Sequence, residues 1–108
     1  MDKDLLKKTE ELLKNYNILL AEIKYLDDES ELKEKKNLKL KLDIAIDSLE
    51  KNDRKVMKLR YLSDKKSTWK EISKEVNLSE SCCRQTVKNR ALKHICNIIY
   101  EKSFKFTS

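Results

Sequence analysis

The sequence contains neither glycine nor proline in 108 residues. Hairpin turns and most β topologies rely on these two residues, because they supply positive φ angles and fixed turn geometry. Lysine, leucine, glutamate and isoleucine dominate instead, and they suit helices with solvated charged faces. The composition therefore predicts an all-α protein, and the length suffices for one small domain with a modest core.

Residues 69–90, WKEISKEVNLSESCCRQTVKNR, have the apolar spacing of a helix-turn-helix, whose second helix can enter a DNA major groove. Asn77 stands at the turn, where a positive φ is needed. Ser79 can cap the second helix, and Thr68 with Glu71 forms a capping-box pattern at the start of the first. The positions expected between the two helices are Ile72, Val76, Leu78, Cys83 and either Thr86 or Val87, with small Ser73 at the closest approach.

Charge is distributed unevenly along the chain. Residues 1–50 hold 10 lysines and 13 acidic residues, a net charge of −3. Residues 51–108 hold 15 lysines and arginines and 6 acidic residues, a net charge of +9. The basic half contains the helix-turn-helix, and lysine and arginine displace condensed counterions from the duplex. A merely soluble basic surface would carry the same charge, but charge and motif together favour double-stranded DNA as the partner.

The first half of the chain predicts a helical hairpin. Residues 3–26 follow the alternating four- and three-residue steps of a coiled coil, with a stripe as wide as a bundle face. After a break at residues 27–30, residues 31–51 form the second helix. We expect residues 1–51 to serve packing or oligomerisation and residues 52–108 to form the DNA-binding region, in one compact unit. The apolar stripe of the second helix consists of Leu38, Leu42, Ala45, Ile46 and Leu49.

Three further helices are expected in the second half. Asn52 or Asp53 can cap the first, DRKVMKLRYL, and a basic loop over residues 63–67 follows it. The last helix, residues 80 to about 101, has an apolar distal end that must pack on the N-terminal hairpin or on a second chain. A homodimer through the N-terminal helix and this distal end is therefore one of two interpretations, packing within the chain being the other.

Residues 53–95 resemble region 4 of the sigma-70 family. DRKVMKLRYL is similar to the family's acidic-Arg helix ending in LRY, STWKEISKEVNLSES to its first motif helix and turn, and RALKHI to its RAL-x-x-L ending. With its long N-terminal helices, the whole chain resembles small regulators of phages and prophages of low-GC Gram-positive bacteria, the RinA/ArpU type. The resemblance implies a three-helix motif with a long last helix, and RNA polymerase as a further partner facing residues 53–62.

Three features depart from the sigma pattern. Trp69 stands where many sigma factors carry an aliphatic residue, and it either anchors the core between two helices or packs near the DNA backbone. The segment from Arg84 to Ala91 is one residue longer, which leaves open whether Arg90 or Ala91 faces the core. No segment resembles the region that melts promoter DNA, so this chain alone is not expected to be a complete sigma factor.

The DNA contacts are expected on the outward face of the second motif helix and around the start of the first. Arg84 can bridge O6 and N7 of guanine, and Gln85 can bridge N6 and N7 of adenine. Glu80 could accept from cytosine N4 or satisfy the helix dipole. A merely solvated face is the alternative for these side chains. Backbone contacts are expected from Lys65, Lys66, Thr68, Lys70, Ser79, Ser81 and Lys88.

Catalysis, cofactor binding and metal binding are not expected. The sequence has no glycine-rich phosphate loop, no HExxH pattern and a single histidine. Its three cysteines lack CxxC spacing and are expected to act as small hydrophobic side chains, with a redox role for Cys82 as the alternative. No apolar run reaches the about 18–20 residues that span a bilayer, and no signal-peptide segment is present, so we expect a cytoplasmic protein without membrane contact.

The leading hypothesis is a sequence-specific DNA-binding transcriptional regulator that could act together with RNA polymerase. One alternative is a small-terminase-like phage DNA-packaging protein, which would form a ring. Another is a protein-interaction adaptor that uses the helix-turn-helix only as a fold, as anti-sigma proteins do. True DNA binding should weaken steeply as salt rises, whereas an adaptor would bind DNA weakly and without that dependence.

Overall fold

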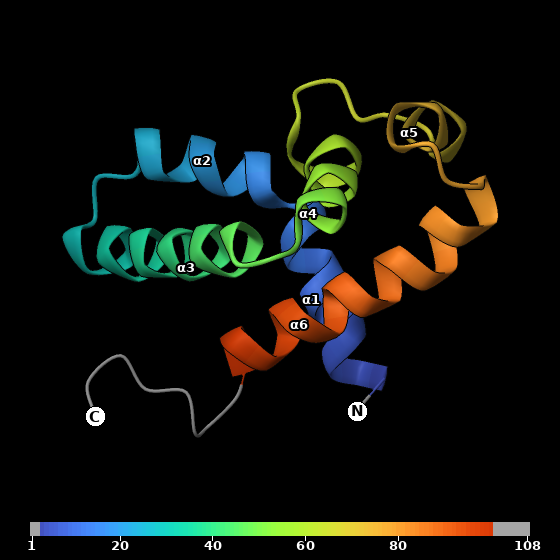
Figure 1. The fold of residues 1–108 in the computed structure, drawn as a ribbon. Coiled ribbons are helices and arrows are strands. Elements are labelled where there is room, and N and C mark those ends of the chain that lie inside the picture. The colour runs from blue at the N-terminus through green and yellow to red at the C-terminus, as the bar shows by residue number, and fades with distance from the viewer. Residues whose placement is uncertain (1–2, 101–108) are drawn as a thin grey trace.

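The computed structural model describes residues 3–100, and every regular element within them is helical (Figure 1). The expected all-α fold is therefore confirmed. No helix in this described part is long and apolar enough to cross a membrane. The elements are α1 (Lys3–Lys14), α2 (Tyr16–Tyr25), α3 (Glu29–Asp47), α4 (Lys51–Met57), the π-helical η1 (Lys58–Leu62), α5 (Trp69–Val76), the π-helical η2 (Cys82–Val87) and α6 (Lys88–Tyr100).

Two long helices are composite. η1 continues α4 without a break, so that residues 51–62 form one helix. Two α-helical residues, Glu80 and Ser81, lead into η2, which continues as α6, so that residues 80–100 form another. The expected end of this helix at Glu101 lies outside the described residues.

The expectation of one helix over residues 3–26 is wrong. The chain bends at Asn15, where φ is −98° and ψ is 11°, and α1 and α2 run in different directions (Figure 1). α2 pairs with α3 as an antiparallel hairpin, in which Glu22 and Lys35 form an ion pair of 2.9 Å. α1 instead crosses to α6 and η1. The bend lets the two halves of one apolar stripe cover two different surfaces.

The larger of two cores lies where α1, α3, α4 and α6 meet. Leu13, Leu42, Met57 and Ile95 come from these four helices, and each is fully buried. Buried Thr9 donates its hydroxyl to a backbone carbonyl one turn earlier at 2.8 Å, so that its polar atom is satisfied. The stripe that offered a homodimer interface is thus covered by the chain's own helices, and the distal end of α6 packs on α1 and α3.

The π-helical turn of η2 determines which residues of the last helix face inward. Cys83, Val87 and Ala91 are buried at steps of four residues, whereas Thr86 and Arg90 are exposed. Steps of four overshoot an α-helical turn of 3.6 residues, but a π-helical turn is wider and keeps such a stripe on one face. Val87 and Ala91 are therefore the inward residues. This π-helical turn overlaps the segment from Arg84 to Ala91, which the sequence resemblance predicts to be one residue longer than in sigma factors.

A bidentate ion pair joins α4 to α6. α4 begins at Lys51 after the N-cap Glu50, so that Asp53, which was expected as a cap, lies within the first turn. Its carboxylate, 7% exposed, accepts hydrogen bonds from Arg90 Nε at 2.8 Å and Nη2 at 2.6 Å. The hydrogen bond and the charge of Asp53 raise the pKa of Arg90. Because an unpaired buried carboxylate is costly, this pair fixes α4 against α6.

Glu10 links α1 to the second half of the chain. Its carboxylate accepts a hydrogen bond from the Tyr61 hydroxyl at 2.6 Å and lies 3.7 Å from Lys88 Nζ. Burial raises the pKa of Glu10, but the Tyr61 hydrogen bond and the charges of Lys88 and Lys14 together outweigh burial and hold this pKa below its ordinary value of 4.5. Glu10 therefore stabilises the fold above that pH, and this contribution is lost as the pH falls through the lowered pKa.

We predict that Arg90→Ala lowers the free energy of unfolding by about 1–3 kcal/mol, because it leaves the buried Asp53 carboxylate without its partner. Urea denaturation followed by circular dichroism measures this change. Lys93→Ala is the matched control, since Lys93 is exposed on the same helix, and its urea midpoint should stay at the parent value. Equal midpoints for both variants would contradict a stabilising role of the ion pair.

We also predict that Glu10→Gln flattens the dependence of stability on pH. The parent should lose stability as the pH falls from about 5 through the lowered pKa of Glu10, and the variant should lose less over this range, because the lowered pKa is removed. The measurement is the urea midpoint at each pH. Glu11→Gln, on the neighbouring exposed carboxylate, serves as the control. A variant profile that parallels the parent's would show that Glu10 is not the titrating group.

Candidate nucleic-acid interface

The predicted helix-turn-helix is formed by α5 and residues 80–87. Residues 80–87 are called the recognition helix below. Asn77 has φ 57° and ψ 40°, and it is the only non-glycine residue with positive φ in the described part of the chain. The next helix is capped by Ser79, whose Oγ accepts the backbone N–H of Cys82 at 3.0 Å. The predicted turn and the predicted cap are both confirmed.

The capping box at the start of α5 is also confirmed. Glu71 donates its backbone N–H to Thr68 Oγ1 at 3.2 Å, and Thr68 donates its own N–H to Glu71 Oε1 at 2.9 Å. The backbone and hydroxyl hydrogen bonds of Thr68 lower the pKa of Glu71. The Thr68 N–H is thus already bonded to a carboxylate. A phosphate at this helix end would have to use the Thr68 hydroxyl, later N–H groups or nearby lysines.

A second, smaller core fixes the recognition helix. Val56, Ile72, Cys83 and Val87 come from α4, α5 and η2 and are buried against one another. Trp69 packs on this cluster, which matches the core-anchor interpretation of that residue. The partly buried side chains around the cluster are Leu59, Trp69, Val76, Leu78 and Cys82. The outward face of the recognition helix is therefore held in a set orientation.

The three cysteines are free thiols, of which Cys83 and Cys96 are buried and Cys82 is half-buried. Burial, followed by the neighbouring Cys82, raises the pKa of the Cys83 thiol, which makes it a poor nucleophile at neutral pH. Among residues 3–100, no three His, Cys, Asp or Glu side chains gather in a group that could hold a metal ion.

The outward face of the recognition helix carries four of the expected DNA-contacting side chains. Glu80, Ser81, Arg84 and Gln85 are all exposed, and within the described residues none of them makes a side-chain hydrogen bond or ion pair. Arg84 and Gln85 directly follow buried Cys83 in the chain. Their donors and acceptors are consequently available to another molecule.

Two of the expected phosphate-binding lysines have partners inside the chain. Lys88 is only 25% exposed and lies 3.7 Å from the Glu10 carboxylate on α1. Lys66 Nζ donates to the backbone oxygen of Lys14 at 3.0 Å. By contrast, Lys65 and Lys70 are exposed, beside the start of α5 and in its first turn. The predicted residues thus divide into an outward group and a group that also contacts α1.

Sequence reasoning missed Arg60. Its guanidinium lies 4.7 Å above the Trp69 ring, and its Nη1 donates to the backbone oxygen of Ser67 at 3.2 Å. Arg60 and Trp69 are nine positions apart in the chain, across a loop, so no helical or strand periodicity relates them. An aromatic residue directly after a basic loop was the one available signal.

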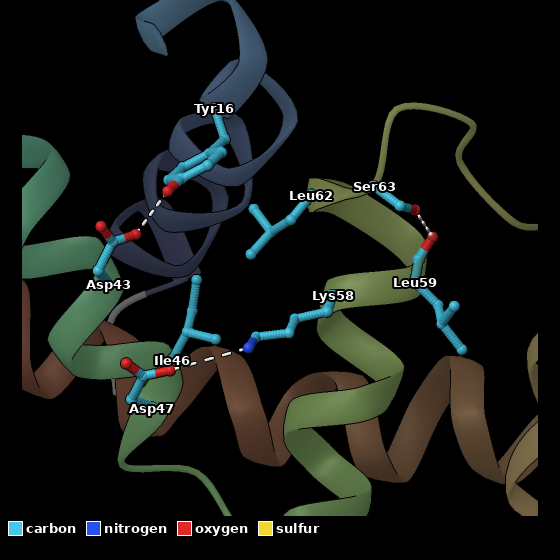
Figure 2. A pocket seen from close by; sticks show the side chains of 8 residues that line it. All are labelled: Tyr16, Asp43, Ile46, Asp47, Lys58, Leu59, Leu62 and Ser63. Carbon is cyan, nitrogen blue, oxygen red and sulfur yellow. Dashed lines mark hydrogen bonds and ion pairs between the residues drawn. The ribbon is translucent and has the colours of Figure 1, made fainter.

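A separate pocket of about 530 Å³ opens between α2, α3 and η1 (Figure 2). The Tyr16 hydroxyl donates to Asp43 at 2.5 Å, and burial, followed by this hydrogen bond, raises the pKa of Tyr16. Lys58 Nζ lies 3.8 Å from Asp47. The polar side chains that line the pocket are thus paired, and the other lining side chains are apolar. The lining residues are Tyr16, Asp43, Ile46, Asp47, Lys58, Leu59, Leu62 and Ser63.

Comparison with known proteins identifies the second half of the chain. Residues 45–95 match the family model described as Sigma-70, region 4. No curated protein and no solved structure matches the chain significantly. The matched segment contains both motif helices, the helix before them, the Asn77 turn and the outward face, whereas α1, α2 and most of α3 precede it. Residues 45–95 therefore form a helix-turn-helix of the sigma-70 region 4 type, which is a DNA-binding family.

Proposed function

We propose that the chain is a sequence-specific DNA-binding transcription regulator, of the small phage or prophage type that its sequence resembles. The observation that carries this proposal is the outward face of the recognition helix. Arg84 and Gln85 are exposed there without partners in the described chain, while Cys83 and Val87 hold the helix on the small core. Adjacent arginine and glutamine side chains can each make a bidentate contact to a purine.

The proposed contacts to the DNA backbone come from both sides of the turn. Lys65 and Lys70 supply charge near the start of α5, and Ser79 and Ser81 supply hydroxyl groups at the start of the recognition helix. The ammonium of Lys66 can keep its bond to the α1 carbonyl and still offer two N–H donors to a phosphate. The proposed function would be carried out in the cytoplasm, where the chain would meet DNA and RNA polymerase.

The direct test is selection of bound sequences from a random duplex library, followed by fluorescence anisotropy on the selected duplexes at about 50 mM and about 200 mM salt. We expect an enriched sequence and an affinity that falls steeply with salt, because phosphate contacts release counterions. Absence of enrichment together with weak, salt-insensitive binding would overturn the proposal in favour of a protein-interaction adaptor.

Substitutions at Arg84 and Lys70 should distinguish base recognition from phosphate binding. Arg84→Ala is expected to reduce discrimination between the selected site and single-base variants by about 1–3 kcal/mol, because one bidentate base contact is lost. Lys70→Ala should weaken binding to selected and random duplexes by the same factor and reduce the slope of log K against log salt by about 1. Anisotropy titrations measure both effects. The same loss on selected and random duplexes for both variants would contradict this division.

RNA polymerase is the second proposed partner. The segment that the sigma resemblance assigns to polymerase contributes Lys58, Leu59 and Leu62 to the pocket of Figure 2, and these are different side chains from those on the outward face of the recognition helix. A polymerase surface and DNA could therefore be bound together. We expect Lys58→Glu to weaken capture of core polymerase and to leave DNA affinity unchanged.

Lys36→Glu is the matched control for the polymerase experiment, because Lys36 is exposed on α3 and does not line this pocket. Unchanged polymerase capture by Lys58→Glu, or equal losses in both variants, would contradict a polymerase contact at the pocket.

A second copy of the chain is a third proposed partner. Since the expected stripe is buried or half-buried, a homodimer would have to use more exposed apolar side chains, of which Ile18, Tyr25 and Leu40 are 58%, 74% and 57% exposed. Native mass spectrometry of the full chain measures its oligomeric state directly. A ring would favour the packaging alternative, whereas a monomer or dimer fits a regulator.

A further inference from the structure

Three cations from separate segments converge beside Tyr61. Lys14 at the end of α1, Arg60 in η1 and Lys66 in the following loop line a pocket of about 350 Å³ together with Tyr61. Lys66 Nζ donates to the backbone oxygen of Lys14 at 3.0 Å, which ties the loop to the C-terminal end of α1. The lining, as far as the structure describes the chain, includes no carboxylate.

Two acidic side chains contact these lining residues from outside the pocket. The Glu11 carboxylate lies 3.7 Å from Lys14 Nζ, and both side chains are more than half exposed. The Glu10 carboxylate accepts a hydrogen bond from the Tyr61 hydroxyl and also forms an ion pair with Lys88. Neither acid contacts Arg60 or Lys66 in the ion pairs and hydrogen bonds of the described chain. The pocket therefore keeps an excess of positive charge.

Arg60 is held in place at this pocket. Its guanidinium stacks 4.7 Å above the Trp69 ring, and its Nη1 bonds the Ser67 carbonyl at 3.2 Å. The remaining guanidinium N–H groups are donors in a fixed planar fork, which suits a phosphate. Trp69 is the first residue of α5. The cluster thus adjoins the first turn of α5, where Lys70 is proposed to contact the DNA backbone.

We propose that Lys14, Arg60 and Lys66 bind a backbone phosphate of DNA, which makes α1 part of the DNA interface. The inference rests on the proposed DNA-binding function and extends it beyond residues 45–95, because Lys14 lies outside the segment that the family covers. The physical reason is that three cations held together repel one another, and a phosphate anion relieves that repulsion through charge-assisted hydrogen bonds.

The test is Lys14→Gln in the full chain. Lys14 is 51% exposed and its side chain pairs only with exposed Glu11 among the described residues, so the fold should not depend on it. Anisotropy titrations over a salt series are expected to show the slope of log K against log salt reduced by about 0.9, with equal loss on selected and random duplexes. Lys14→Arg, which keeps the charge, should restore the parent slope.

Lys7→Gln is the matched control. Lys7 is exposed on the same helix and loses the same charge, but it lies about 10 Å earlier along the axis and does not line the pocket. Its slope should equal the parent's. An unchanged slope in Lys14→Gln, or an equal drop in Lys7→Gln, would overturn this inference while leaving DNA binding in place. Failure of the unsubstituted chain to bind any duplex would overturn both the inference and the proposed function.

Discussion

One helix, residues 80–100, has to belong to two cores at once, and the rest of the structure depends on this constraint. Its first part buries Cys83 and Val87 in the small core behind the helix-turn-helix, and its second part buries Leu92 and Ile95 in the large core. The two inward faces must therefore agree in register across the junction. The π-helical turn of η2 brings about that agreement, and the Asp53–Arg90 pair holds α4 to the same helix just after the turn.

The two halves of the chain are consequently not independent lobes. α1 packs along α6, and its Glu10 carboxylate contacts both Tyr61 from η1 and Lys88 from the start of α6. These partly buried contacts attach α1 to the helix-turn-helix region of residues 45–95. A small domain buries a smaller fraction of its surface than a large one and is only marginally stable, so the contacts with α1 add to its stability.

The features that could be predicted from the sequence are those decided by neighbouring residues. The Thr68–Glu71 capping box, the Asn77 turn and the Ser79 cap each depend on hydrogen bonds within a few residues, and all three are present. The inward stripe of α3 and the exposure of Arg84 follow from helical periodicity in the same way.

The features that could not be predicted depend on tertiary contacts. The bend at Asn15 has no glycine or proline to signal it, and it becomes necessary only because α6 and α3 offer two separate surfaces. The partners of Lys66 and Lys88 come from α1, 52 residues away for Lys66, at a separation that no local pattern encodes. Likewise, Asp53 looks like a helix cap until Arg90 is folded beside it.

The continuous helix also sets a direction in space. Residues 80–100 run without a break over about 30 Å, and neither a glycine nor a proline interrupts this helix. A partner that grips the α2–α3 hairpin would therefore be aimed at a fixed angle and phase relative to whatever the first turns of the helix touch. If the chain binds DNA as proposed, this fixed geometry would make its effect depend on which side of the double helix a neighbouring site faces.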